Sequence, residues 1–115
     1  MAAGPAKFVH EGEAIDYTPG ADTLVGAVVV QAEMVGVAVA PIKANQLGSL
    51  AVSGVFDFPK AGGAGSAIPA GTNTYWDAGA QNATKNAAAG ANKLIGKAVK
   101  TTVDADTVVR VRLLQ

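Results

Sequence analysis

Turn-forming residues interrupt the chain about once every ten residues, and only short apolar runs lie between them. No run keeps the 3.6-residue period of an amphipathic helix for long. Many short strands separated by regular turns are typical of an all-β protein. The sequence therefore predicts a small single-domain β-sandwich or barrel of about eight to nine short antiparallel strands. Residues 1–7 have nothing to bury, so we expect a flexible N-terminal arm, followed by one β domain over residues 8–115.

The expected strands follow from the apolar runs between the turns. They cover residues 7–10, 14–18, 27–30, 34–42, 47–58, 73–77, 81–85, 93–100 and 107–114. Residues 86–92 are ambiguous, because their alanines favour helix while Gly90 and the flanking asparagines do not, and either a turn of helix or a loop fits. Residues 60–71, rich in glycine and alanine, predict a mobile loop of the kind that often makes contacts.

Residues 24–42 form the longest apolar stretch, and a hydropathy scan would mark it as a membrane segment. A spanning helix would place Glu33 near its middle, at a cost of about 2.5–3.5 kcal/mol. Gly26, Gly36 and Pro41 also break the stretch, which is rich in valine. Two buried strands joined by a turn at residues 31–33 are the better interpretation.

Two segments show the period-2 order of a half-buried strand. Within residues 47–58 the inward face holds Leu50, Val52, Phe56 and Phe58, and the outward face holds Ser49, Ala51, Ser53 and Asp57. In the last segment Val109, Val111 and Leu113 face one way, while Arg110 and Arg112 face the other. This arginine pair could grip a carboxylate on a partner protein or simply lie in solvent at a sheet edge.

Composition excludes several functional classes. The nine basic and nine acidic residues balance, which argues against a nucleic-acid-binding protein with a basic stripe. The chain has no cysteine, which excludes disulfides, a thiolate nucleophile and zinc–sulfur sites, and the single histidine excludes a multi-histidine metal site. The first residues lack the charged and apolar regions of a secretory signal.

Candidate chemical groups are few. His10 beside Glu11 and Glu13 is best interpreted as a surface histidine in an acidic turn. Asp104 and Asp106 lack the remaining ligands of a calcium loop, so they predict a turn before the last strand. The glycines of residues 62–65 are not followed by Lys-Ser or Lys-Thr, so a phosphate loop is poorly supported. We expect no catalytic residue, metal or cofactor.

Several segments, in order, resemble a known family. The segment FVHEGEAIDYT (residues 8–18) is similar to the family's N-terminal F-V-x-x-G-x-x-I-D-Y-T pattern, and MVGVA (34–38) to its L-V-G-V-A strand. Residues 48–60 match G-x-L-A-V-x-G-V-F-D-x-P-K closely. Residues 75–77 match Y-W-D, residues 94–99 match L-I-G-x-A-V, and residues 109–113 match V-R-V-R-L. The family is that of tailed-phage capsid cement or decoration proteins. Residues 61–70 and 87–91 match no motif of the family.

The resemblance implies a structural protein without catalysis. After synthesis in the host cytoplasm, such a protein binds the outer surface of the mature icosahedral head. There it staples neighbouring subunits of the major capsid protein against the outward pressure of the packaged DNA. It could also contact copies of itself as a dimer or trimer, and neither nucleic acid nor a membrane is an expected partner.

The arm, the loop and the arginine pair are the expected sites of contact with the capsid or a neighbouring subunit. The candidate residues are Ala2, Ala3, Pro5, Lys7, Phe8, Lys60, Ile68, Pro69, Arg110 and Arg112. The alternative function is a phage or bacterial β-sandwich module that binds glycans or adhesins, with Trp76 as the stacking platform. A single tryptophan in a domain of this size is, however, more often a core residue.

Overall fold

A computed structural model describes residues 4–114 of the chain. It contains nine strands and one short 3₁₀ turn, η1. In chain order these are β1 (Ala14–Tyr17), β2 (Val28–Gln31), β3 (Met34–Ala38), β4 (Gly48–Ala51), β5 (Gly54–Pro59), β6 (Asn73–Asp77), β7 (Asn82–Thr84), η1 (Ala88–Gly90), β8 (Lys93–Ala98) and β9 (Val108–Leu113). The part of the chain that the structure describes contains no α-helix, which confirms the all-β prediction.

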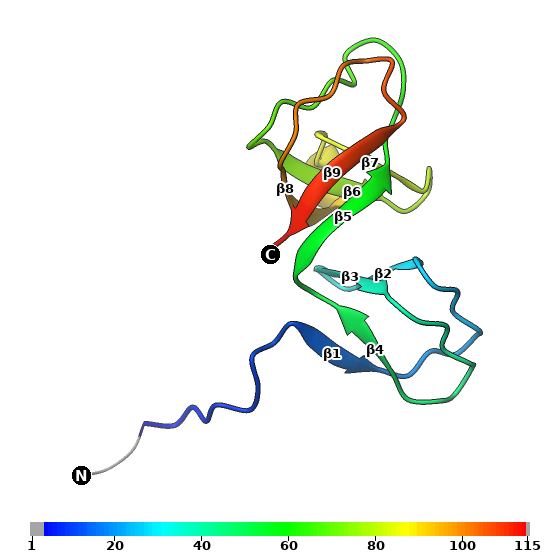
Figure 1. Ribbon diagram of the computed structural model, residues 1–115, viewed down its shortest axis with the longest axis vertical. Helices are drawn as coiled ribbons and strands as arrows, with labels where there is room; N and C mark the ends of the chain where they lie inside the picture. Colours follow the sequence, from blue (N-terminus) through cyan, green and yellow to red (C-terminus); the bar gives the residue numbers. More distant parts are fainter. Residues whose placement is uncertain (1–3, 115) are drawn as a thin grey trace.

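The strands form two antiparallel sheets. The first has the order β1-β4-β3-β2, and the second has the order β5-β9-β8-β6-β7. In Figure 1 the two sheets lie one beyond the other along the long axis, and the N-terminal segment extends away from the first sheet. An isolated bridge between Lys60 and Ala83 brings the end of β5 to β7 without closing the sheet. The architecture is therefore sandwich-like and not a closed barrel.

The long apolar stretch folds as the predicted two strands joined by a turn, but only β3 is buried, and β2 is half-buried. β2 and β3 pair from Val28↔Val37 to Gln31↔Met34, and Ala32 in the turn adopts a φ of 53°. β3 ends at Ala38 rather than continuing to residue 42, because the chain bends at residues 39–40 before Pro41, which has no N–H to donate. Within residues 4–114 no helix is long and apolar enough to cross a membrane.

The single strand predicted over residues 47–58 is wrong. The segment forms two strands in different sheets, β4 in the first and β5 in the second, with Val52 and Ser53 between them. Gly54 begins β5 with a φ of +108°, a conformation that other residues rarely adopt, and this allows the chain to change direction. Leu50 and Phe58 are both buried as predicted, but they lie in two different apolar clusters.

The larger cluster belongs mainly to the second sheet. It contains Phe58, Ile68, Trp76, Ala83, Ile95, Ala98, Val109, Val111 and Leu113, together with Val35 and Val37 from β3. The alternation in β9 is as predicted, since Val109, Val111 and Leu113 are buried while the two arginines are exposed. The two valines of β3 connect the sheets, so this core is shared between them.

The smaller cluster lies within the first sheet. Its buried members are Ala38, Ile42 and Leu50, and Ile15 and Tyr17 of β1 are among the half-buried residues packed against it. A Cβ on Gly48 would come within 2.7 Å of Ile42 side-chain atoms, so this position requires glycine. The cluster is small because β1, β2 and β4 are each only four residues long.

Most of the remaining strand predictions are confirmed, and one is wrong. β6, β7, β8 and β9 lie within their predicted ranges, and η1 is a turn of helix, one of the two alternatives predicted for residues 86–92. Residues 7–10 were predicted as a strand, but they are exposed and belong to neither sheet. An extended segment becomes a strand only where another strand satisfies its backbone groups.

Candidate contact surfaces

The N-terminal segment is the most exposed part of the described chain. Residues 4–11 are all exposed, and the side chains of Phe8 and Val9 are 80% and 83% exposed. The one hydrogen bond that the structure gives within the segment is donated by the Gly12 N–H to Nδ1 of His10. Pro5, Lys7 and Phe8 are thus accessible for contact, while Ala2 and Ala3 lie outside the described residues.

Lys60 does not lie on the surface. Its residue is only 6% exposed, and its ammonium donates hydrogen bonds to Ala61 O at 2.8 Å, Ser66 Oγ at 3.1 Å and Asp106 O at 3.2 Å. The carbonyl oxygen of Asp104 is also within reach, at 3.5 Å. Lys60 therefore ties the start of the 60–71 loop to the 103–107 turn, an arrangement we call the lysine clip.

The rest of that loop is also held in place. The carboxylate of Asp104 accepts hydrogen bonds from the backbone N–H groups of Ala67 at 2.8 Å and Gly65 at 3.3 Å. These bonds lower the pKa of Asp104 below its usual value. Ile68 is fully buried, and its N–H donates to Thr102 Oγ1 at 3.0 Å. Such contacts argue against the mobile loop that the composition predicts, and they leave Pro69 as its exposed candidate residue.

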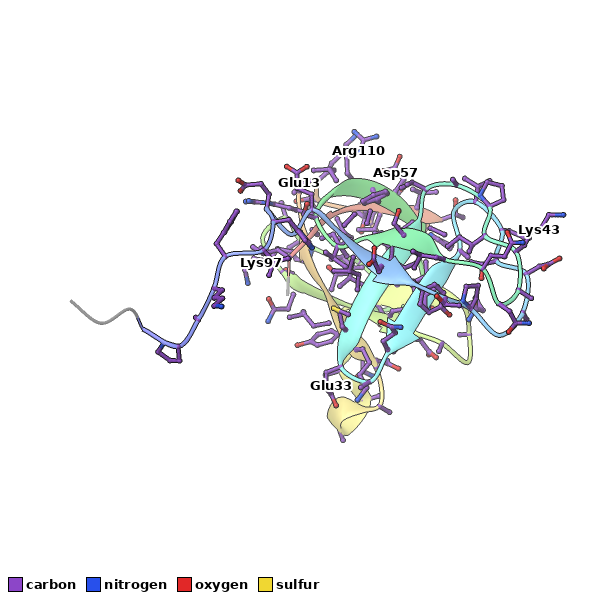
Figure 2. The ribbon with its side chains drawn as sticks, turned by 90° about the horizontal axis from the view of Figure 1, so that it is seen from below. Glu13, Glu33, Lys43, Asp57, Lys97 and Arg110 are labelled. Carbon is purple, nitrogen blue, oxygen red and sulfur yellow. The ribbon has the colours of Figure 1, made fainter. Side chains whose placement is uncertain are left out.

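The outward face of β9 carries one ion pair. The Arg110 guanidinium donates to both carboxylate oxygens of Asp57 on β5, at 2.9 and 3.2 Å, and the two labelled side chains lie together in Figure 2. This bond lowers the pKa of Asp57 and raises that of Arg110. Arg112 is exposed and lies opposite Val55 on one side and Lys97 on the other. The sequence thus failed to distinguish Arg110, which has a carboxylate partner within the chain, from Arg112.

The aromatic residues do not form a stacking platform. Trp76 is 3% exposed, and its ring packs against Phe58 with the centroids 6.1 Å apart. Tyr75 alternates with it and is half-buried on the other side of β6. The interpretation of Trp76 as a core residue is confirmed, and the glycan-binding alternative loses the residue on which it depended.

The polar residues considered for catalysis or metal binding are dispersed. Asp104 and Asp106 lie in the predicted turn, where Asp106 Oδ2 accepts a hydrogen bond from the Val103 N–H at 2.9 Å. Across residues 4–114, no group of three or more His, Cys, Asp or Glu side chains is placed to hold a metal ion. The exposed His10 lies in the N-terminal segment, away from both sheets.

One exposed apolar group was missed by the sequence reasoning. Leu24, Val25 and Leu47 are 76%, 61% and 70% exposed, and all three lie in the connections at one end of the first sheet. The hydrogen bonds Thr23–Ile42 and Ala44–Asp22 hold these connections together. In the sequence, Leu24 and Val25 merge with the apolar run of β2, so no periodicity separates the exposed residues from the buried ones.

The comparisons with known proteins identify the family. A family model of phage cement proteins matches residues 9–113, which covers both sheets and every strand. The searches of curated proteins and of solved structures gave no match. The motif residues that suggested the family also occupy defined places, since Asp57 pairs with Arg110 and Lys60 forms the lysine clip. With the match spanning nearly the whole chain, this protein belongs to the phage cement protein family.

Proposed function

We propose that this protein binds the outer surface of the mature phage head and staples neighbouring subunits of the major capsid protein. The observation that carries the proposal is the match to the cement family over residues 9–113. Cement proteins are structural, so the proposed activity is capsid stabilisation without a chemical reaction. The protein would oppose DNA pressure because separating two capsid subunits would also break its contacts with them.

The exposed surfaces suggest how a small protein could span such a seam. The N-terminal segment and the Leu24–Val25–Leu47 group belong to the first sheet, whereas Pro69 and Arg112 belong to the second. Contacts at both ends of an elongated body would reach two subunits at once. Repetition over many identical sites on the head would make modest individual contacts effective.

The contact residues form part of the proposal. Pro5, Lys7, Phe8, Pro69, Arg110 and Arg112 are exposed and can meet a capsid subunit or a neighbouring copy. Lys60 and Ile68 are buried, so they would act only by holding the 60–71 loop in shape.

The direct test is co-sedimentation with purified mature heads. We expect a fixed copy number per capsomer and greater resistance of decorated heads to heat. Binding equally to unexpanded heads and to free capsid protein, or a lack of any effect on head stability, would contradict the stapling role.

A second test examines the contacts separately from the fold. Deleting residues 1–7 should leave both sheets folded, as measured by far-UV circular dichroism, and reduce occupancy on heads, because these residues precede every strand. Replacing exposed Pro69 tests the loop without disturbing the lysine clip, and Ser49→Ala on the exposed part of β4 serves as a matched surface control. Unchanged occupancy for both test variants would remove the arm and the loop from the interface.

A further inference from the structure

β1 has a free edge. It is the first strand of its sheet and pairs with β4 alone among the described strands, from Ala14↔Ala51 to Tyr17↔Gly48. The Glu13 carbonyl accepts a hydrogen bond from the Val52 N–H, so the alternation of an antiparallel pair turns the backbone groups of Ala14 and Asp16 away from β4. A free edge with unpaired N–H and C=O groups is a template for another extended segment.

The segment just before β1 is complementary to β1 itself. If residues 6–11 are laid antiparallel to residues 12–17, Lys7 falls opposite Asp16, Phe8 opposite Ile15 and His10 opposite Glu13. Opposite charges and apolar pairs directly across two strands stabilise a sheet. The same register places the exposed Phe8 on the side of β1 where Ile15 and Tyr17 pack against the small cluster. Phe8 would thus enlarge the weaker of the two cores.

The backbone at the turn argues against folding this segment onto its own β1. A hairpin in this register would have Glu11 and Gly12 as its two loop residues, and the favoured two-residue loops need a positive φ at the first of them. Gly12 has a φ of 77°, but Glu11 is not among the residues with positive φ. Figure 1 shows the segment leaving β1 instead of lying beside it, and Figure 2 shows it continuing away from the body beyond Glu13.

We propose that two copies of this chain exchange their N-terminal segments, so that residues 6–11 of each copy add to the free edge of the partner's β1. The pairing is reciprocal about a two-fold axis, because every contact in this register occurs twice. It joins two four-stranded sheets into one continuous sheet, a form of β-strand addition. The inference deepens the proposed function by naming the partner of the arm, and it is tested on the isolated protein.

Charge exchange tests the register. Sedimentation of the full chain over a wide concentration series should show a dimer. Lys7→Glu should weaken the dimer about tenfold, because it turns both Lys7–Asp16 attractions into repulsions. Asp16→Lys should do the same, and the double variant should restore the dimer. Lys7 precedes every strand, so its substitution cannot unfold the sheets, and Lys43→Glu in the β3–β4 connection is the matched control.

Cross-linking tests which chain supplies the segment, and the absence of native cysteines makes it specific. Val9 and Ala14 are both exposed and fall opposite each other, so Val9→Cys with Ala14→Cys should form disulfides between chains. Val9→Cys with Thr18→Cys is the control, since Thr18 lies about 13 Å further along, beyond disulfide range.

Three results would overturn the proposal: a monomer at all concentrations, a disulfide that joins the two introduced cysteines within one chain, or equal cross-linking by the control pair. None of these readouts uses phage heads. A dimer that does not bind heads would therefore refute the proposed function alone, and a monomer that binds them would refute the strand exchange alone.

Discussion

The two sheets differ in how much core each contains. The second sheet has five strands around a cluster with Phe58, Trp76, Ile95 and Leu113 among its members, whereas the first sheet's own cluster has three buried residues beneath four short strands. Since burial of apolar surface supplies most of the folding free energy, the second sheet holds the fold together. The first sheet depends on sharing Val35 and Val37 with the larger cluster. The first sheet can carry exposed apolar residues such as Leu24, Val25 and Leu47 because it is not the main source of stability.

The sharpest contrast is between the central glycines of the two sheets. A Cβ on Gly96 of β8 would collide with the backbone carbonyl oxygen of Arg112, whereas a Cβ on Gly36 of β3 would meet the Leu50 side chain at 3.0 Å. Gly96→Ala should cost about 3 kcal/mol or more, because β9 would have to move, and Gly36→Ala about 1 kcal/mol. Urea unfolding measures the loss of unfolding free energy in each variant, and equal losses would show that β9 can move to accommodate the added methyl group.

Truncation of one isoleucine in each cluster tests the difference in core size. Ile95→Ala should destabilise the protein by about 4 kcal/mol and Ile42→Ala by about 2 kcal/mol, since Ile42 has fewer buried neighbours among which a cavity could form. Trp76 fluorescence reports the second sheet, and far-UV circular dichroism reports both. The two signals should coincide in the unmodified protein, because the shared valines make unfolding cooperative. An earlier transition by circular dichroism would mean that the first sheet melts alone.

The lysine clip gives a smaller effect, confined to the second sheet. Lys60→Met should cost about 2 kcal/mol, because the methionine fills the space but leaves the carbonyls of Ala61 and Asp106 without their shared donor. Lys97→Met, at an exposed position of β8, is the matched control and should be nearly neutral. Proteolysis within residues 61–67 should accelerate in the first variant only. Equal protection would show that the contacts of Asp104 and Ile68 hold the loop without Lys60.

Asp104 makes the same loop sensitive to acid. Backbone hydrogen bonds lower its pKa below 3.8 in the folded protein, so the folded state binds this proton less readily than the unfolded state does. Its stabilising effect is complete above the unfolded pKa and is lost as the pH falls through the folded pKa. Thermal melting between pH 6 and about 2 should therefore show a shallower acid decline in Asp104→Asn than in the unmodified protein. If the melting temperature falls equally with pH in Asp104→Asn and in the unmodified protein, the Asp104 carboxylate is not an acid-sensitive contact.

The exposed ion pair should matter least for stability. Arg110→Ala should change the melting temperature little, because both side chains are about half exposed and solvent screens the pair. The neighbouring substitution Arg112→Ala should change it no more. Reduced head occupancy by either variant, with melting unchanged, would assign that arginine to the interface. A large loss of stability in Arg110→Ala would show that the pair is structural.

The sequence predicted the second sheet better than the first. In β9, three buried residues alternate with polar ones, so one face was unambiguous. The apolar run of β2 and β3 was divided correctly because Glu33 interrupts it at the turn. The prediction of a single strand over residues 47–58 was wrong because the alternation continues through Val52 and Ser53, where the chain passes from one sheet to the other. Period-2 order records which side is buried, but not against which sheet it packs.

The candidate contact residues were harder to predict, because a pattern does not reveal a side chain's tertiary partner. Lys60 follows a strand and resembles a surface lysine until the 103–107 turn closes over it. Arg110 and Arg112 have identical local patterns, yet only Arg110 lies opposite an aspartate. Phe8, a predicted contact residue, is exposed, and its contact with a capsid subunit or a neighbouring copy stays a prediction.

The passage from β4 to β5 has a mechanical consequence. Only Val52 and Ser53 separate the sheets along the chain, and both are partly buried, so this junction has little slack to extend under tension. A force that displaces one sheet would be transmitted to the other through the backbone of Val52 and Ser53. Because the β4–β5 junction extends so little, the contact surfaces on the two sheets would stay at a nearly constant distance from each other while the surface to which they bind is strained.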